Sequence, residues 1–485
     1  MESSNNEITA KVLEVSQVAP RPSSTVSEAS LPLTSFDLPL LLRTPPEHLL
    51  FYEVPNLQVT RFMNSALPQI KHSLSQTLQY LYPLAGNLIW SQDHNQPIIK
   101  YVYGDSVTLK VVESNASFNH LSGYHARYAE EFQHLAPQLT TIESSSSNEN
   151  SDRSKAVPVL ALQITLFENA GYCLGITQLH CVVDGRSAAM FRNLWAFFSQ
   201  LRNASPSLPD QSLVPSFNRS MIKDEENGLR KLYLQHLVEF IQSKSMSEQD
   251  CNNWLSLSLS LKIPPKQVAV SFLLTSTDIA RLRKLWVSMA QSTNNERHPS
   301  KFVLACAYLW VCLAKASKNS TQDHDEEISS IAFAADCRSR LDPPLPTTYF
   351  GNCVMLVKAS AKRSDIVGED GIVVAVNSVM KETRGLCNVL VKNTERALNL
   401  LLSGGPRRID VIAGSTLFGY YKLDFGWGRP KKVELLSTAR TGAIFFADCG
   451  NGDDGGVEMS LVRAKDEADA FGRAFRSGLN DLLFE

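Results

Sequence analysis

The residues best suited to chemistry lie in one short segment, Gln178 to Gly185, near the middle of the chain. A strand is expected to end at His180, and Asp184 follows four residues later, before a glycine and a helix. Histidine is the natural general base because the pKa of its imidazole lies near neutrality. Asp184 could orient the ring directly, or turn away and pair with an arginine. The segment therefore predicts an imidazole held at the end of a rigid strand for proton transfer.

Three other interpretations of this segment stay open from the residues alone. With 10 histidines in the chain, a chance His-x-x-x-Asp pattern is about an even bet, so a structural role for His180 is the simplest interpretation. Cys181 could be a thiolate nucleophile, but a neighbour at a strand end usually points the opposite way. A metal site would need more ligands, and no nearby cluster of His, Cys and Asp supplies them. The choice depends on other motifs.

A second motif near the C-terminus reads Asp424-Phe425-Gly426-Trp427-Gly428. Two glycines around an aromatic residue predict a tight, well-packed loop in which Asp424 accepts hydrogen bonds. The Asp-Phe-Gly of protein kinases is excluded, because no His-Arg-Asp loop, glycine-rich loop or Val-Ala-Ile-Lys strand precedes it. A structural loop is the favoured interpretation, and direct chemistry by Asp424 is the alternative.

The elements expected around His180 are a hairpin and a helix. Residues 156–168 and 172–179 have the pattern of two strands, and 169–171 between them suits a hairpin turn. Apolar residues then recur with a helical period from 186 to 201, at Met190, Phe191, Leu194, Trp195, Phe198 and Leu201. His180 is thus expected between a strand and the N-terminus of a helix.

The second half of the chain also mixes strands with helices. A strand at 268–274 leads into Thr275 and Asp278, which resemble a capping box for a helix through Trp286. A further helix is expected at 301–316 and a further strand at 328–334. The class is therefore α/β.

Polar stretches separate these elements, at 140–155, 205–218 and 317–327, and are expected to be surface loops. The second of them, rich in Pro and Ser, marks the best boundary. The sequence therefore predicts two domains, 1–219 and 220–485.

Composition bounds the class of protein. The 485 residues carry 47 Lys and Arg against 49 Asp and Glu, a net charge of −2, which argues against binding nucleic acid through bulk positive charge. Nine dispersed cysteines without a Cys-x-x-Cys pair favour a reducing compartment. No signal peptide is expected at the start, and the longest uncharged apolar run, 302–314, is too short to span a bilayer. These features predict a cytosolic protein without a membrane anchor.

Taken together, the motifs resemble the plant BAHD acyltransferase family. The family has a His-x-x-x-Asp-Gly motif in mid-chain and Asp-Phe-Gly-Trp-Gly near the C-terminus, as this sequence does. Tyr349-Phe350-Gly351-Asn352-Cys353, after 338–344, is similar to the signature of the branch that acylates anthocyanins and phenolic glycosides. Further matches at 33–37, 74–86 and 302–310 extend the resemblance from about residue 10 to the end, with 140–155 as an insertion.

The resemblance implies two chloramphenicol acetyltransferase-like domains, each a mixed sheet with flanking helices, and a solvent channel between them. His180 would be the general base for acyl transfer from coenzyme A to a hydroxyl, and Asp424 is a second catalytic candidate. Asp184 would hold its loop by an ion pair with Arg338, or otherwise with Arg340. The residues expected to shape the two loops are Gly185, Gly426 and Trp427.

The implied co-substrate is an acyl-coenzyme A, with no tightly bound cofactor and no metal. Coenzyme A is polyanionic, so a nearly neutral chain must supply local cations. The helix N-terminus after Thr275 could assist. The positions similar to family contacts are Lys262, Lys266, Ser271, Ser300 and Lys301.

The donor in this branch is malonyl- or hydroxycinnamoyl-coenzyme A, and branch resemblance favours malonyl. A malonyl carboxylate calls for a buried arginine that offers a bidentate contact, and Arg186 is the candidate. The expected reaction is malonyl transfer to a sugar hydroxyl of a phenolic or flavonoid glucoside by a monomer.

Two other hypotheses remain. One is a non-catalytic homologue that binds ligands. The other is a carrier-dependent condensation domain, which ranks last because Leu179 precedes His180 where two adjacent histidines are usual, and because no carrier domain follows.

Overall fold

The computed structural model describes most of the chain. The described residues are 8–22, 27–91, 96–140, 156–201, 214–223, 228–243, 262–289, 298–317, 327–385, 409–450, 452–453 and 455–482.

The first half is built on a six-stranded mixed sheet. Only β6 and β9 run parallel within it, and the other neighbours are antiparallel. Asn169, at a φ of 61°, makes the turn that joins β9 to β10. In spatial order the strands are β1 (Ala10–Val18), β6 (Val107–Ser114), β9 (Leu160–Phe167), β10 (Gly171–Gln178), β3 (Glu47–Glu53) and β15 (Lys432–Leu435).

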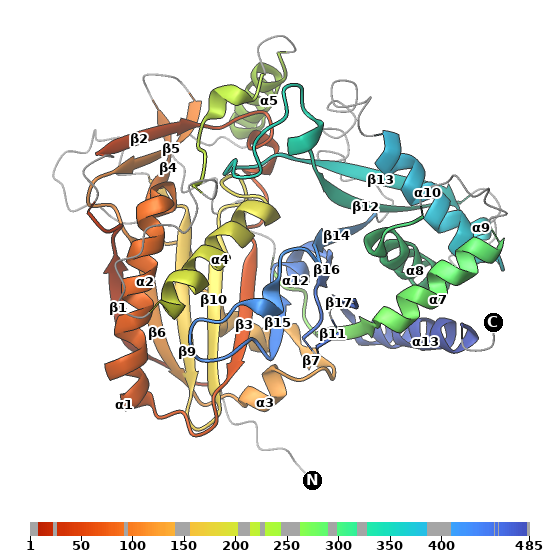
Figure 1. Ribbon diagram of the computed structural model, residues 1–485, viewed down its shortest axis with the longest axis horizontal. Coiled ribbons are helices and arrows are strands. Elements are labelled where there is room, and N and C mark those ends of the chain that lie inside the picture. Colours follow the sequence, from red (N-terminus) through yellow and green to blue (C-terminus); the bar gives the residue numbers. More distant parts are fainter. Residues whose placement is uncertain are drawn as a thin grey trace.

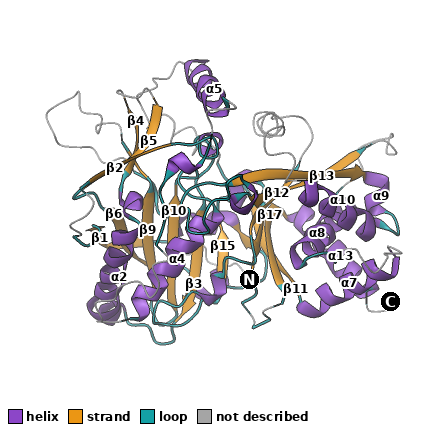
Figure 2. Ribbon diagram, turned by 45° about the horizontal axis from the view of Figure 1, so that its top comes forward, coloured by secondary structure: helices purple, strands orange, loops and turns teal. Residues whose placement is uncertain are grey.

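Two long helices, α2 (Leu67–Tyr80) and α4 (Gly185–Gln200), cover one face of this sheet (Figure 1). Their apolar side chains share one core with the strands. A smaller antiparallel sheet adjoins them, in the order β2 (Glu28–Pro32), β5 (Gln96–Val102), β4 (Asn87–Ser91) and β8 (Val157–Pro158). The shorter helices of this half are α1 (Val59–Arg61) and α3 (Phe118–Leu121), and α5 (Leu229–Ser243) lies at the margin of the molecule (Figure 2).

The second half is built on a seven-stranded mixed sheet with its long helices gathered on one side (Figure 2). The strand order is β13 (Val354–Lys362), β12 (Ile328–Asp336), β14 (Asp410–Gly414), β16 (Ile444–Ala447), β17 (Val457–Ala464), β11 (Gln267–Leu274) and β7 (Arg127–Tyr128). The helices are α7 (Ser276–Met289), α8 (Lys301–Ala316), α9 (Arg363–Val367), α10 (Gly371–Gly385), α12 (Thr438–Thr441) and α13 (Lys465–Asp481). The buried α8 packs against α10 and α13.

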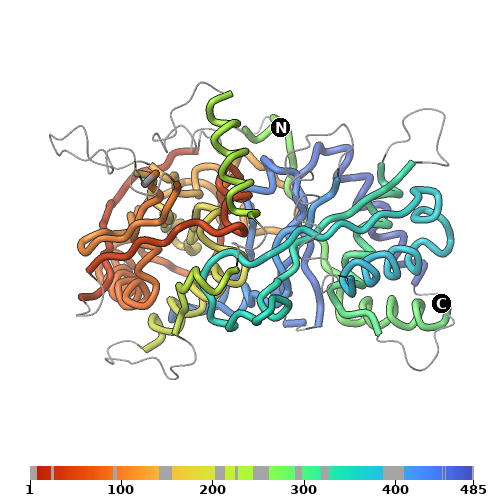
Figure 3. Tube along the Cα trace, turned by 90° about the horizontal axis from the view of Figure 1, so that it is seen from above, coloured from red at the N-terminus to blue at the C-terminus, as the bar shows by residue number. Residues whose placement is uncertain are grey.

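The two halves lie side by side and exchange short strands (Figure 3). The late strand β15 pairs with β3 and completes the first sheet, and the early strand β7 pairs with β11 at the edge of the second. The domain boundary between residues 219 and 220 stays a prediction, but each sheet contains one strand from across it.

The α/β class and the elements predicted around the motifs are confirmed. The hairpin, the helix after Asp184 and the strand and helices of the second half lie where the patterns placed them. Thr275 and Asp278 form the predicted capping box, since the Asp278 amide N–H donates to Thr275 Oγ1 at 3.1 Å and the Thr275 amide donates to Asp278 Oδ2 at 3.0 Å. The predicted surface loops fall largely outside the described residues.

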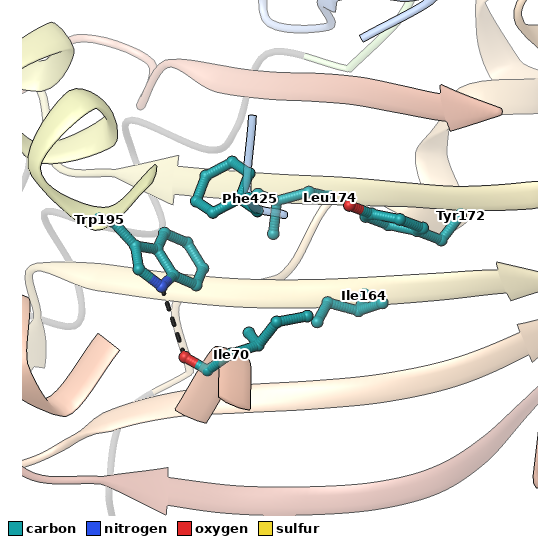
Figure 4. Close-up of a pocket in the computed structure, with 6 residues that line it drawn as sticks. All are labelled: Ile70, Ile164, Tyr172, Leu174, Trp195 and Phe425. Carbon is teal, nitrogen blue, oxygen red and sulfur yellow. Dashed lines mark hydrogen bonds between the residues drawn. The ribbon is translucent and has the colours of Figure 1, made fainter. Parts of the chain in front are cut away.

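The core under α4 is closely packed. A void of about 10 Å³ lies between α2, α4 and the sheet, with room for about one water molecule (Figure 4). Its rim includes Trp195, whose indole N–H donates to the Ile70 carbonyl at 3.4 Å. The lining residues are Ile70, Ile164, Tyr172, Leu174, Trp195 and Phe425. A void this small and this apolar does not accept a substrate.

Candidate active site

His180 lies in the tight turn between β10 and α4. The strand ends two residues earlier, and the Val182 amide donates to the Leu179 carbonyl at 3.1 Å to close the turn. The His180 carbonyl accepts a 3.1 Å hydrogen bond from the side-chain amide of Asn352, which comes from the second half. The residue is half-buried, and its Nδ1 is buried without a hydrogen-bond partner among the described residues. The backbone of the turn is thus held by contacts from both halves.

The surroundings of His180 favour the neutral imidazole. Burial is the largest influence and lowers its pKa below the ordinary value of 6.5. The Arg43 guanidinium lowers the pKa further, while the backbone carbonyl of His180 and the Asp184 carboxylate act in the opposite direction. A neutral imidazole can accept a proton, so the electrostatics suit a general base.

Asp184 turns away from the imidazole and caps α4. Its Oδ1 accepts from the Ser187 amide at 2.8 Å, and its Oδ2 accepts from Arg338 at 2.7 Å and from the Cys353 amide at 3.1 Å. Both partners of this ion pair are buried. This is the pairing with Arg338 that the resemblance implied, and Arg340 instead donates to the Asp336 carbonyl.

Arg338 also holds the Tyr349–Cys353 motif against the start of α4. Its guanidinium donates to the Tyr349 carbonyl at 3.1 Å and to the Gly351 carbonyl at 2.9 Å. Ser187 completes the contact, because its hydroxyl accepts from the Gly351 amide at 3.0 Å. The motif therefore joins the second half to the turn that carries His180.

Asn352 joins the same turn to the N-terminal region. Its side-chain amide donates to Asp37 Oδ1 at 2.9 Å as well as to the His180 carbonyl. Asp37 Oδ2 accepts from the Thr34 amide at 2.9 Å, which places the segment 33–37 beside the site. Asn352 was given no role from the sequence, although its motif was singled out.

Gly185 lies where a side chain has no room. A Cβ built on it would lie 2.4 Å from the Phe418 ring. Phe418 belongs to the loop before the Asp-Phe-Gly-Trp-Gly motif and packs edge-on against Tyr420, at 6.1 Å between centroids. The glycine thus allows this loop to approach the start of α4.

Asp424 is far from His180 and organises its own loop. Its Oδ1 accepts from the amides of Gly426 at 2.7 Å and Gly428 at 3.1 Å, and both glycines have positive φ, at 94° and 100°. Its carbonyl accepts from Gln200 at the last turn of α4. Since a helix of 16 residues spans about 24 Å, this places Asp424 at the opposite end of α4 from His180. These contacts give Asp424 a structural role in its loop, and Trp427 packs beside the same core. A catalytic role for Asp424 stays a prediction.

The candidate coenzyme A contacts lie along β11 and at the start of α8. Lys262 and Lys266 are exposed before and at the beginning of β11, whereas Lys301 Nζ donates to the Gly456 carbonyl near the other end of that strand. Ser271 contacts Lys432 and Ser460, and Ser300 caps α8 by accepting from Val303. Because eight strand residues span about 27 Å, these groups do not form one cluster. Their roles stay predictions.

Arg186 points to the surface. Its guanidinium pairs with Asp336 at 3.2 Å and donates to the Thr347 carbonyl at 3.3 Å, and its side chain is 45% exposed. The candidate for a buried carboxylate contact is therefore already engaged in a bridge between the two halves.

Sequence reasoning missed a polar cluster beside the site that comprises His48, Gln178, Arg192 and Tyr420. His48 on β3 lies opposite Ile176 of β10, and Arg192 lies over the Tyr420 ring at 4.6 Å. The sequence feature that could have indicated this cluster is Arg192, a charged residue among the apolar positions of the helix.

Within the described residues, no group of three or more His, Cys, Asp or Glu side chains is placed to hold a metal ion. No helix in that part of the chain is both long and apolar enough to cross a membrane.

Comparisons with known proteins agree with this geometry. A family model described as the Transferase family matches residues 11–476. Phenolic glucoside malonyltransferase 2 of Arabidopsis thaliana is 33% identical over 98% of this chain and 100% of its own. The malonyl-CoA:anthocyanidin 5-O-glucoside-6''-O-malonyltransferase of the same plant is 35% identical over 96% of this chain and 98% of its own. The crystal structure of vinorine synthase superposes with a TM-score of 0.65 at 19% identity, over 95% of this chain and 96% of that one, which confirms the predicted fold.

Proposed function

Because the chain belongs to the Transferase family, the BAHD acyl-coenzyme A-dependent acyltransferases, we propose that it moves a malonyl group from coenzyme A to a sugar hydroxyl of a phenolic glucoside. The observation that carries the choice of donor and acceptor is the likeness to two malonyltransferases of phenolic and anthocyanidin glucosides over nearly the whole chain. The half-buried position of His180 and the lowered pKa of its imidazole support the chemistry.

In the proposed reaction His180 is the general base. Its neutral imidazole takes the proton of the acceptor hydroxyl as the oxygen attacks the thioester carbonyl. The tetrahedral intermediate then breaks its C–S bond, and the imidazolium returns the proton to the departing sulfur. The products are the malonyl ester and free coenzyme A, and no acyl-enzyme forms.

The other residues have supporting roles in this proposal. Asp184 and Arg338 hold the turn that carries His180, and Asp424 holds the loop at the far end of α4. The five residues along β11 and α8 bind the phosphates and pantetheine of coenzyme A in a channel between the two halves. We also place the chain in the cytosol as a monomer without a tightly bound cofactor. The seven cysteines that the structure describes are buried and form no disulfide, which suits a reducing compartment.

The test is a donor screen with the purified chain. Malonyl-, acetyl- and p-coumaroyl-coenzyme A are each offered with a panel of phenolic and flavonoid glucosides, and free thiol and acylated product are measured. We expect malonyl transfer to dominate. His180→Ala is expected to lower kcat about 10²–10⁴-fold, the usual contribution of a positioned base. The control Cys181→Ala is expected to retain activity.

The outcomes separate the alternatives. Preferred use of p-coumaroyl-coenzyme A would contradict the malonyl donor, and failure to release coenzyme A with any pair would favour a non-catalytic homologue. Activity in His180→Ala close to that of the wild type would contradict the proposed base. Loss of activity in Cys181→Ala, together with a covalent acyl-Cys181 in the wild type, would indicate a nucleophile.

A further inference from the structure

Arg192 is a charged side chain on the buried face of α4. It lies four residues after Ala188 and three before Trp195, so all three face the sheet. Ala188 and Trp195 belong to the apolar core, and Arg192 itself is 0% exposed. A cation at such a position is unusual, because burial of an unpaired charge costs free energy.

No carboxylate forms an ion pair with Arg192 among the residues that the structure describes. Its three guanidinium nitrogens are buried and have no hydrogen-bond partner among the described residues. The guanidinium lies over the Tyr420 ring at 4.6 Å from the centroid, and Tyr420 is the side chain that stabilises its charge most. The Asp448 carboxylate also raises the pKa of Arg192, but it accepts hydrogen bonds from the amides of Tyr420 at 2.8 Å and Tyr421 at 3.2 Å.

Neighbouring polar groups are unsatisfied as well. His48 stacks on Tyr420 at 5.6 Å and contacts its hydroxyl at 3.2 Å, while its Nδ1 is buried without a partner. Both atoms of the Gln178 side-chain amide are also buried and unpartnered among the described residues. Gln178 lies two residues after Ile176, the register partner of His48, so it shares a sheet face with His48. The unpartnered polar atoms of His48 and Gln178 therefore lie on the same face of the sheet.

This cluster is close to the proposed base. The positive charge of Arg192 and the imidazole of His180 each lower the pKa of His48, so His48 lies within electrostatic reach of both. His180 follows Gln178 by two residues along the same backbone. Gln178 therefore connects the face that carries His48 to the turn that carries His180.

We infer that Arg192 binds the carboxylate of the transferred acyl group, with His48 and Gln178 as further polar neighbours. The inference rests on the proposed malonyl transfer. A carboxylate can accept two parallel N–H bonds from a guanidinium, which offsets the cost of the buried cation. In a malonyl thioester one methylene separates the carboxylate from the reacting carbonyl, so the anion must bind next to the base. Arg186 is less suitable because its guanidinium already pairs with Asp336.

The experiment compares malonyl- with acetyl-coenzyme A, which has the same thioester and no carboxylate. A glucoside without a carboxylate is the acceptor throughout, so the donor is the only source of the anion. Arg192→Met is expected to lower kcat/KM about 100-fold for malonyl-coenzyme A and less than about threefold for acetyl-coenzyme A. Arg192→Lys retains the charge but loses the bidentate guanidinium geometry, so its kcat/KM for malonyl-coenzyme A is expected to lie between those of the wild type and Arg192→Met. Arg186→Met is the matched control and is expected to keep the wild-type preference.

A binding measurement avoids dependence on turnover. In the His180→Ala background, calorimetry is expected to show that Arg192→Met weakens the binding of malonyl-coenzyme A and leaves the binding of acetyl-coenzyme A unchanged. The unchanged binding of acetyl-coenzyme A would also show that the site is folded. If Arg192→Met fails to fold, the Arg192→Lys comparison decides in the same way.

The outcomes distinguish the inference from the proposed function. Two outcomes overturn only the assignment of Arg192, provided that the wild type prefers malonyl-coenzyme A. In the first, the Arg192 variants keep that preference; in the second, kcat/KM falls equally for both donors. If the wild type prefers a neutral aromatic donor, the proposed function fails and this inference fails with it.

Discussion

At the residue scale, the decisive property of His180 is its protonation state. Burial and the Arg43 guanidinium both lower its pKa, and Asp184, which would raise it, is paired with Arg338. The Asp184 carboxylate therefore holds the turn and does not form an ion pair with a protonated His180. A base of lowered pKa stays neutral in mildly acidic solution.

We expect the acidic limb of kcat/KM against pH to have its midpoint below 6.5, the ordinary pKa of the imidazole. Activity requires the neutral ring, so a lowered pKa extends activity towards lower pH. Arg43→Gln removes a positive charge, raises the pKa of His180 and should move the limb to higher pH. Steady-state profiles of both proteins provide the measurement. An unchanged midpoint in a folded Arg43→Gln would contradict this electrostatic role.

At the element scale, α4 connects the two motifs that the sequence made prominent. Its first turn carries Asp184 and Ser187, which bind Arg338 and Gly351, and its last turn holds the Asp424 loop through Gln200. The helix therefore fixes the relative positions of the two motifs. The buried ion pair at its start joins elements that are 154 residues apart in the chain.

Arg338→Met is expected to destabilise the protein by about 3–5 kcal/mol, because it leaves the Asp184 carboxylate buried without its cation. Urea unfolding followed by circular dichroism measures the change. Arg186→Met breaks a partly exposed pair and should cost less than about 1 kcal/mol. The double variant Asp184→Asn with Arg338→Met should recover part of the loss. Equal effects of the two single arginine variants would refute the special role of the buried pair.

At the scale of the whole molecule, exchanged strands and buried charges join the two sheets. Lys432 of β15 pairs with Glu458 of β17, and Arg127 of β7 pairs with Glu434 of β15 at 2.9 Å. Lys432 and Arg127 are fully or almost fully buried. These pairs lie between the first and second sheets, so neither sheet keeps its charge partners when the other unfolds.

We therefore expect the intact chain to unfold in a single transition, with the calorimetric enthalpy close to the van't Hoff enthalpy. Lys432→Met, which leaves two buried glutamates without this cation, should lower stability by about 3–5 kcal/mol and keep one transition. Lys465→Met removes an exposed pair with Asp469 and serves as the control. Two well-separated transitions in the wild type would show that the halves are energetically independent.

The sequence by itself determined the family, the α/β class and the elements around His180. These follow from local periodicity and from ordered motifs, which are properties of short segments. Only the tertiary structure decided that Asp184 pairs with Arg338, that Asp424 lies a helix length from the base and that Arg186 is engaged at the surface. It also showed that Arg192 is buried without a paired carboxylate. It also decided that β15 and β7 cross between the halves. The physical reason is that burial and charge pairing depend on residues from β3, β10, α4 and the segment after β14, which no local pattern brings together.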